Sequence, residues 1–367
     1  MTLQNVHAQP DDWVTSGGRV DRTGRMSFTR LGSSFTLSWK KQFSAGIAGS
    51  PIIINDILLL PFLNGELAAL QLANGKSLER KKYGAGPIVG LTVSGDTLYF
   101  AMPQERQSLR AYDVSRGRNV WKLELGPIEG APAADKDRLF VGTASHQFYC
   151  LDRMDGTILW QKREKAPIGT SPAVISGRVT YSDREGNVYS RESKTGELIW
   201  QVTLVSDSSG MAEKYYSYPV VVNERVFLTT LGGSVYALSA KDGSQLWRRR
   251  LGDPLFAAVS ADSSGVFVPT SSGRIFGLKW DSGEVLWTYD GESIVNAQMA
   301  LGDSILVATA LRGDIIILDK RNGNLLWSHT LKSRILGAPV AHSRALIIAD
   351  DNRWVYTFTS QGRPGIK

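Results

Sequence analysis

The residue types that carry most enzyme chemistry are few in this sequence, and they are scattered. The four histidines are His7, His146, His329 and His342, and none stands at metal-ligand spacing from another histidine or from the single cysteine. Cys150 lies in the strand-like stretch QFYCLD, which favours a small buried side chain over a nucleophile. No nucleophile elbow accompanies the serines. The sequence therefore predicts no catalytic residue, no metal site and no cofactor site.

Two motif-like stretches are predicted to be ordinary turns or loops. DKRNGN (319–324) has some features of a calcium loop, but Arg321 occupies a ligand position and no glutamate follows at the twelfth position. GAGPIVG (84–90) contains three glycines, but it precedes a strand pattern, so it is not a phosphate-binding loop. Neither stretch therefore predicts a catalytic or ligand-binding site. The most informative feature of the sequence is the repeat that runs along the whole chain.

A spacing of about 40 residues organises the chain. Each unit shows short strand patterns separated by glycine turns, and four strands per 40 residues are typical of a β-propeller blade. Eight turn glycines predict an all-β fold of eight blades, each with four antiparallel strands. These glycines are Gly75, Gly117, Gly156, Gly196, Gly243, Gly283, Gly323 and Gly362.

The two ends of the chain supply complementary parts of one blade. The last repeat reaches Gly362 without a final Gly-x-x-x-Trp strand, whereas FTLSWKKQF (35–43) is an outer strand with no blade before it. We predict that this N-terminal strand closes the last blade, because closure removes exposed sheet edges. Residues 1–30 are then expected to form an N-terminal extension, and residues 31–367 the propeller.

A tryptophan follows most of the turn glycines by four residues, and Glu79 replaces it after Gly75. We predict that these tryptophans lie between neighbouring blades, where each indole N–H needs a backbone carbonyl. They are interpreted as architectural residues that dock blade on blade. With the one on the N-terminal strand they are Trp39, Trp121, Trp160, Trp200, Trp247, Trp287 and Trp327.

Charge and hydropathy limit the classes of protein. The net charge of +7 is compatible with anionic partners, but the basic runs are short, so nucleic-acid binding is not predicted. No apolar stretch reaches the length of a membrane-spanning helix. Val6-His7-Ala8 fits the small-x-Ala rule for signal cleavage, and one hypothesis is that residues 1–8 are the tail of a secretion signal that starts upstream.

The repeat Asp/Asn/Ser/Thr-Gly-x-(Leu/Val/Ile)-(Leu/Ile/Val)-Trp resembles the tryptophan-docking repeat of pyrroloquinoline-quinone-type propellers. The leader DDWVTSGGRVDRTGR (11–25) is similar to the lead-in of many such proteins. The quinoprotein dehydrogenases of this superfamily carry a vicinal cysteine pair, which a chain with one cysteine lacks. The chain looks more like the non-enzymatic BamB branch. That resemblance implies a monomeric, periplasmic or envelope-associated ring without a cofactor, which acts within a larger complex and binds protein partners such as outer-membrane assembly components.

One interval between the turn glycines is longer than the others, and it contains an insertion rich in tyrosine. In the BamB family, neighbouring loops that dock on the partner carry a Leu-Arg pair and an Asp-x-Asp pair. The matching loops here, EKAPIGTSP (164–172) and MAEKYYSYP (211–219), carry neither pair. Tyrosine and methionine are enriched at interfaces, although these aromatics could also pack back onto the blade. The candidate partner-binding residues are Lys165, Ile168, Met211, Lys214, Tyr215, Tyr216 and Tyr218.

Two functions follow from these observations. The first is a non-catalytic scaffold for protein–protein interaction in a cell-envelope complex. The alternative is a quinoprotein-type enzyme or ligand-binding propeller that uses the central channel. The alternative needs polar or acidic residues at the starts of the inner strands, whereas stretches such as PIIIN and PVVVN are mostly aliphatic.

Overall fold

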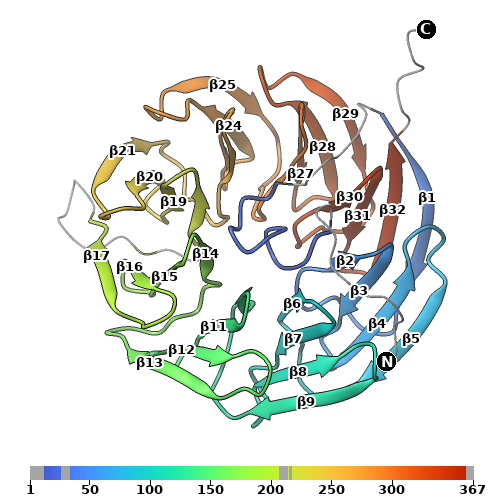
Figure 1. Ribbon diagram of the computed structural model, residues 1–367. Coiled ribbons are helices and arrows are strands. Elements are labelled where there is room, and N and C mark those ends of the chain that lie inside the picture. Colours follow the sequence, from blue (N-terminus) through green and yellow to red (C-terminus); the bar gives the residue numbers. More distant parts are fainter. Residues whose placement is uncertain (1–11, 26–33, 206–213, 215–216, 361–367) are drawn as a thin grey trace, which may run out of the picture.

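The computed structural model describes residues 12–25, 34–205, 214 and 217–360. Within these ranges the chain forms 32 strands in eight four-stranded antiparallel sheets. The sheets stand around a central axis as the blades of a propeller (Figure 1), so the predicted all-β, eight-bladed fold is confirmed. The described residues contain no helix that is long and apolar enough to cross a membrane.

Each blade is numbered in chain order, and its strands run from the axis outward. Blade 1 comprises β2 (Ile52–Ile54), β3 (Ile57–Pro61), β4 (Glu66–Gln71) and β5 (Ser77–Lys82); blade 2 comprises β6 (Gly90–Ser94), β7 (Thr97–Ala101), β8 (Leu109–Asp113) and β9 (Arg118–Leu123); blade 3 comprises β10 (Ala133–Asp135), β11 (Arg138–Gly142), β12 (Gln147–Asp152) and β13 (Ile158–Arg163); blade 4 comprises β14 (Ala173–Ile175), β15 (Arg178–Ser182), β16 (Asn187–Glu192) and β17 (Leu198–Thr203).

The second half of the ring repeats the plan. Blade 5 comprises β18 (Val220–Val222), β19 (Arg225–Thr229), β20 (Ser234–Ser239) and β21 (Gln245–Arg250); blade 6 comprises β22 (Ser260–Asp262), β23 (Gly265–Pro269), β24 (Arg274–Leu278) and β25 (Val285–Asp290); blade 7 comprises β26 (Ala300–Leu301), β27 (Ile305–Thr309), β28 (Asp314–Asp319) and β29 (Leu325–Thr330); blade 8 comprises β30 (Val340–His342), β31 (Ala345–Ala349), β32 (Trp354–Ser360) and β1 (Phe35–Gln42).

Blade 8 is built from both ends of the described chain. Strand β1 pairs antiparallel with β32, from Phe35 opposite Ser360 to Gln42 opposite Trp354. A bulge between Leu37 and Trp39 adjusts the register. The predicted closure by the N-terminal strand is therefore confirmed, and it joins the first and last repeats into one ring.

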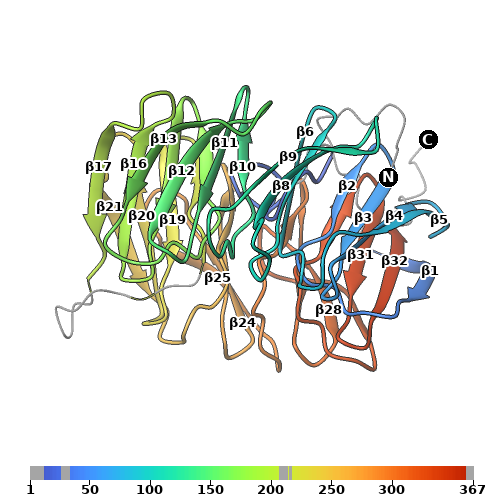
Figure 2. The same ribbon diagram turned by 90° about the horizontal axis from the view of Figure 1, so that it is seen from below.

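The ring has two faces, which we name by their loops (Figure 2). The crossover face carries the loops that lead from one blade into the next, together with the turns between second and third strands. In seven blades such a turn donates a backbone hydrogen bond to the crossover loop entering the same blade, for example Arg184 N to Pro167 O at 3.0 Å. The turn face carries the remaining turns. Bonds of this kind hold the crossover loops in fixed positions on their blades.

Tryptophans dock each blade on the next. Six indoles donate to a backbone carbonyl of the following blade at 2.8–3.1 Å, and each lies against the turn glycine of that blade. At Gly243 (φ +75°) a Cβ atom would lie 2.7 Å from the ring of Trp200, so only glycine leaves room for the indole. The donor–acceptor pairs are Trp39–Leu72, Trp121–Arg153, Trp160–Ser193, Trp200–Ala240, Trp247–Trp280 and Trp287–Lys320.

Trp327, the seventh of these tryptophans, packs against the rings of Phe35 and Phe358 in blade 8, with centroids 5.5 and 5.9 Å away. Small side chains lie opposite most tryptophans on the third strand, and Cys150, opposite Trp160, is one of them. Its thiol is buried, and burial raises its pKa to about 12. A protonated, enclosed thiol at this position is a packing group.

Candidate functional site at the axis and the crossover face

The leader, residues 12–25, occupies the axis of the ring, where Figure 1 shows it as the dark blue trace. Its carbonyl oxygens accept hydrogen bonds from the inner strands of six blades at 2.9–3.1 Å. The segment that we expected as part of an extension is thus central to the ring. The acceptors and donors are Trp13 and Ile53, Val14 and Val93, Val20 and Val174, Asp21 and Val221, Thr23 and Ala261, and Gly24 and Leu301.

Arg22 anchors the leader with a guanidinium group that is completely buried. It makes five hydrogen bonds of 2.6–3.2 Å, all to uncharged oxygens. Burial lowers the pKa of Arg22, to about 10, so the group still carries its charge at neutral pH. A charge that is buried at this depth is tolerated only when its donors are satisfied. The five acceptors are the carbonyls of Ser16, Ala131, Pro132 and Pro172 and the hydroxyl of Thr15.

Tyr218 covers the leader on the crossover side. Its hydroxyl donates to Gln298 Oε1 at 2.7 Å, and the Gln298 amide donates in turn to the carbonyls of Arg22 and Val259, both at 2.7 Å. The Arg22 guanidinium lies 5.7 Å from the centre of the tyrosine ring. Burial raises the pKa of Tyr218 to about 12. The sequence predicts Tyr218 as a candidate partner-binding residue. In the structure its side chain contacts Gln298 and Arg22 at the axis of the ring.

A quinone cofactor of the kind that the repeat family implies does not fit these residues. The leader backbone and the Arg22 side chain lie at the axis, where the central channel of the alternative hypothesis would lie. A cavity of about 250 Å³ remains beside them, and the leader residues Asp21, Thr23 and Arg25 contribute to its lining. Within the described ranges, no group of three or more His, Cys, Asp or Glu side chains converges as metal ligands would. We therefore derive no reaction through a quinone.

The crossover loop 164–172 rises from a buried polar cluster. Glu164 accepts from Arg191 at 2.9 Å and from the Tyr181 hydroxyl at 2.6 Å, and Arg191 also donates to that hydroxyl at 2.7 Å. Burial raises the pKa of Tyr181 well above its usual value, so the phenol stays protonated as a donor. The cluster fixes the start of the loop, and the next residue, Lys165, is exposed on the crossover face.

Ile168, in the same loop, is a core residue. Its side chain is fully buried, and its N–H donates to Thr143 O at 3.0 Å. A partner on this face cannot reach it in this conformation, which removes it from the candidate interface. A signal for this was present in the sequence, since a proline followed by a buried aliphatic residue recurs in equivalent loops: Pro87-Ile88, Pro127-Ile128, Pro167-Ile168 and Pro254-Leu255.

The insertion before blade 5 is described in part. Met211, Tyr215 and Tyr216 lie outside the described residues. Lys214 is exposed, and its carbonyl accepts from Leu231 N at 2.8 Å, in the manner of the other crossover loops. The structure therefore brings Lys165 and Lys214 onto the same face, at the entrances of neighbouring blades.

Sequence reasoning missed an ion pair beside these lysines. Arg184, in the turn between β15 and β16, pairs with Glu129 from the loop that enters blade 3. Both side chains are partly exposed. We call Glu129, Lys165, Arg184 and Lys214 the charged patch. It lies over blades 3 to 5.

Over blades 6, 7, 8 and 1 the crossover face carries exposed apolar side chains together with ion pairs, namely Asp253–Arg274, Glu292–Arg312 and Arg334–Asp351. Large apolar side chains over blades 6, 7, 8 and 1 are 37–55% exposed; they are Leu63, Phe256, Ile294 and Leu336. Leu63 and Leu336 border a cavity of about 460 Å³ between blades 8 and 1. Ion pairs thus occur on both halves of the crossover face, and Val205, which is exposed in the loop that enters blade 5, adds an apolar side chain on the side of the charged patch.

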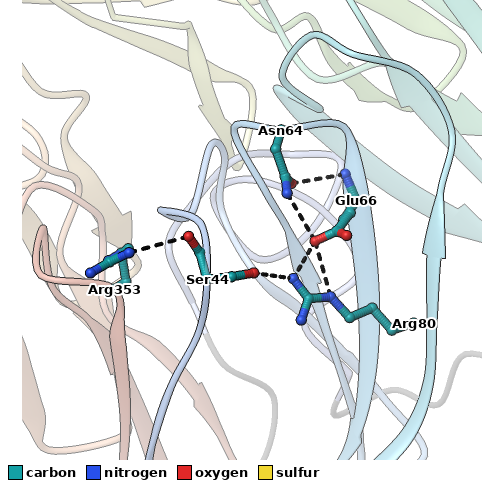
Figure 3. Close-up of polar contacts among 5 residues, drawn as sticks. All are labelled: Ser44, Asn64, Glu66, Arg80 and Arg353. Atoms are coloured by element: carbon teal, nitrogen blue, oxygen red, sulfur yellow. Dashed lines mark hydrogen bonds and ion pairs between the residues drawn. The ribbon is translucent and has the colours of Figure 1, made fainter.

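A polar network beside this cavity ties blade 8 to blade 1 (Figure 3). Arg353 of blade 8 donates to the carbonyl of Ser44 at 3.3 Å, and Arg80 of blade 1 donates to the Ser44 hydroxyl at 2.6 Å. Arg80 also pairs with Glu66, which accepts from Asn64 at 2.9 Å. These hydrogen bonds, Asn64 first, hold the pKa of Glu66 below its usual value. The network is a structural clasp on the closing seam.

Comparison with known proteins agrees with this architecture. The family model described as outer membrane protein assembly factor BamB matches residues 22–162, 105–212, 152–296 and 184–364. A curated relative with that name, from Legionella pneumophila (strain Paris), is 24% identical over 169 residues, which are 43% of this chain and 43% of the relative. The matched part thus spans less than half the length of that relative.

Two solved structures show the same fold. BamB from Moraxella catarrhalis has a TM-score of 0.72 at 15% identity, covering 89% of this chain and 100% of that one. Quinohemoprotein alcohol dehydrogenase from Comamonas testosteroni has a TM-score of 0.78 at 11% identity, covering 99% and 83%. Identities this low show the fold alone, whereas the family model spans nearly the whole ring. The chain belongs to the BamB family of outer membrane protein assembly factors.

Proposed function

We propose that this protein is a non-catalytic scaffold that binds a protein partner in the cell envelope, within an outer-membrane assembly complex. One observation carries the proposal. The chain's own leader lies at the axis and is hydrogen-bonded to the inner strands of six blades, while exposed charged side chains stand on fixed loops of the crossover face. Loops on a rigid scaffold are where binding proteins place their contacts.

The charged patch over blades 3 to 5 is the surface that we assign to the partner. Its Glu129–Arg184 pair is partly exposed, and pairs of this kind contribute little to stability, about 0–1 kcal/mol. Glu129 and Arg184 can therefore break their mutual ion pair and pair with a bound protein at a small cost in folding free energy. Lys165 and Lys214 add positive charge on either side, which suits a partner with an acidic surface.

The envelope location and the assembly role rest on the relatives, which carry the name of an outer membrane protein assembly factor. The departure of loops 164–172 and 211–219 from the family's docking pairs means that the contacts differ in detail. We infer that charge takes over part of the role of those pairs in this chain.

Site-specific crosslinking tests the proposal. A photoreactive amino acid is placed at Lys165 in one protein and at Lys194 in another. Both lysines are exposed in the same neighbourhood of the ring, but Lys194 lies in the turn between β16 and β17, on the turn face. We expect position 165, and not 194, to crosslink to an outer-membrane assembly component in intact cells.

The charge-reversal variants Lys165→Glu and Lys194→Glu provide the matched control. The first is expected to lower recovery of the crosslinked partner from a neighbouring patch position, Arg184, and the second to leave it unchanged. Equal crosslinking from both faces, or none from position 165 while position 194 reacts, would contradict the assignment of the charged patch.

A further inference from the structure

At several of the interfaces between neighbouring blades, which we call seams, a cation from the chain lies near the docked indole on the turn face. At the start of the second strand, blades 4 and 5 have Arg178 and Arg225. Each guanidinium crosses to the next blade and donates to the carbonyl that already accepts the docking tryptophan. Arg178 reaches Ala240 O at 2.5 Å, and Arg225 reaches Trp280 O at 2.8 Å.

Other seams are filled by other cations. Between blades 2 and 3, Arg153 donates to Ser94 O at 3.0 Å. Between blades 6 and 7, Lys320 pairs with Asp262 at 2.7 Å, and both side chains are buried. A cation from the chain is thus a recurrent way to close the gap beside the docked indole.

The seam between blades 8 and 1 has no arginine at the register position of Arg178 and Arg225, as is also the case for blades 1, 2, 6 and 7, where that position holds Ile57, Thr97, Gly265 and Ile305. Ala345 holds the register position of the two arginines, since it pairs with His342 and Thr359 just as Arg178 pairs with Ile175 and Glu192. The tryptophan-accepting carbonyl is present, because Trp39 donates to Leu72 O at 2.8 Å.

A cavity of about 290 Å³ lies where the guanidinium would be. Leu72, Ala345 and Thr357 line it, and Asp56 stands at its edge with a side chain that is 79% exposed. The Thr357 hydroxyl is buried without a hydrogen-bond partner. Its register equivalent in blade 4, Ser190, also lacks one although Arg178 fills that seam, so the acceptors that count for a ligand are Leu72 O and the carboxylate of Asp56.

The charged side chains in the lining of the cavity are Asp56 and Arg344. His342 lies 3.6 Å from Asp56 and 3.8 Å from the buried carboxylate of Asp12. Arg344 is exposed and also lines the cavity. Asp56 is the carboxylate in the lining, and Asp12 is not part of it. A planar group with several donors can satisfy the Leu72 carbonyl and the Asp56 carboxylate together.

We propose that this pocket between blades 8 and 1, the seam pocket, binds an arginine side chain of a partner protein, which supplies from outside the guanidinium that Arg178 and Arg225 supply at two other seams. The pocket is on the turn face, opposite the charged patch. It is thus a second interaction site. The proposal for this pocket does not depend on the proposal for the charged patch, and each can be refuted without the other.

The test uses the full chain and N-acetyl-arginine amide as the probe, with the uncharged N-acetyl-citrulline amide as its match. The Trp39 indole N–H resonance is the reporter, since its acceptor, Leu72 O, would be shared with the probe. We expect a saturable shift of this resonance with a dissociation constant of about 1–10 mM. The citrulline probe should give no saturable shift.

Variants locate the site. Ala345→Arg should fill the pocket and weaken probe binding by about tenfold or more, a loss of about 1.4 kcal/mol. Asp56→Asn should weaken probe binding several-fold. Because this position is exposed, the variant should fold normally and can be measured even if Ala345→Arg folds poorly. Asp137→Asn, in the equivalent turn of blade 3, should change nothing. Absence of a saturable shift up to about 50 mM probe, or equal affinity in all variants, would overturn the proposal.

Discussion

At the axis of the ring and at the seam between blades 8 and 1, acceptor oxygens gather around a space that can hold a guanidinium. The chain places its own arginine at the axis but not at this seam. At the axis, backbone carbonyls and a hydroxyl surround Arg22, which comes from the leader. At the seam, a carbonyl, a hydroxyl and a carboxylate border a cavity, and Ala345 stands where an arginine would. The acceptors around Arg22 therefore stabilise the fold, whereas those at the seam pocket are the ones that we assign to a ligand.

The position of the seam explains why it differs. Every other seam joins consecutive repeats, whereas this one joins the first and last blades, with β1 completing blade 8. On the crossover side this seam has its own clasp through Ser44, Arg80 and Arg353. With that clasp and the docked Trp39, closure does not require a further guanidinium on the turn face.

Removing the guanidinium at the axis should have the largest effect. Arg22→Met removes five hydrogen bonds at the axis, and two of the five acceptors, Thr15 Oγ1 and Pro132 O, keep a hydrogen bond with the Thr92 hydroxyl. We expect a loss of about 3–5 kcal/mol in the free energy of unfolding, measured by urea denaturation. Arg22→Lys should restore only part of this loss, because a single ammonium cannot reach the same acceptors.

Arg25→Met is the control, because Arg25 is an exposed arginine of the same leader. It should cost less than about 0.5 kcal/mol. If Arg22→Met and Arg25→Met were equally mild, the leader would be held by its backbone hydrogen bonds, and the axis would not be a true counterpart of the seam.

The Lys320–Asp262 pair extends the comparison to a filled seam and predicts a pH dependence. Burial alone would raise the pKa of Asp262, but hydrogen bonds from Lys320 and Ser264 and the charge of Lys320 outweigh it and hold this pKa below 3.8. The pair therefore stabilises the fold above pH 3.8, and this contribution is lost as the pH falls through the lowered pKa.

Asp262→Asn should consequently cost about 3 kcal/mol at pH 7, where it leaves a buried ammonium unpaired. The difference from the wild type should shrink below pH 3.8, as measured by urea unfolding across this range. Asp281→Asn, in the exposed pair with Lys279, is the matched control and should show a difference of about 0.5 kcal/mol or less at any pH. A gap that stays constant with pH would show that Asp262 titrates normally.

Much of the fold follows from the sequence because its signals are periodic. The turn glycines and the tryptophans repeat, so the eight blades and the closure by residues 35–42 could be predicted. The leader's place at the axis could not, since DDWVTSGGRVDRTGR has no strand or helix period. Its conformation is imposed by the inner strands of the surrounding blades, which are distant in sequence.

The candidate site was harder to predict for the same reason. Lys165 and Lys214 could be chosen from loop positions, but Ile168 and Tyr218 are of types that suit an interface as well as a core. The Glu129–Arg184 pair joins two repeats and has no local signal. The seam pocket is visible in the sequence only when Ala345 is aligned with Arg178 and Arg225, and that alignment needs the strand register.

Opening a filled seam should have the smallest effect on stability and gives the sharpest test of the comparison. Arg178→Ala removes one exchangeable donor from Ala240 O, which keeps its bond from Trp200, so we expect a loss of about 1 kcal/mol. The new gap should then bind N-acetyl-arginine amide and shift the Trp200 indole resonance, as the wild-type seam shifts that of Trp39. Glu224 occupies the place of Asp56 there, since its carbonyl accepts from Ala240 N as that of Asp56 accepts from Leu72 N. The contrary outcome is that the probe binds the seam between blades 8 and 1 but not the opened seam. In that case a carbonyl and a carboxylate are insufficient for binding, and the specificity must come from His342 of blade 8 and Asp12 of the leader.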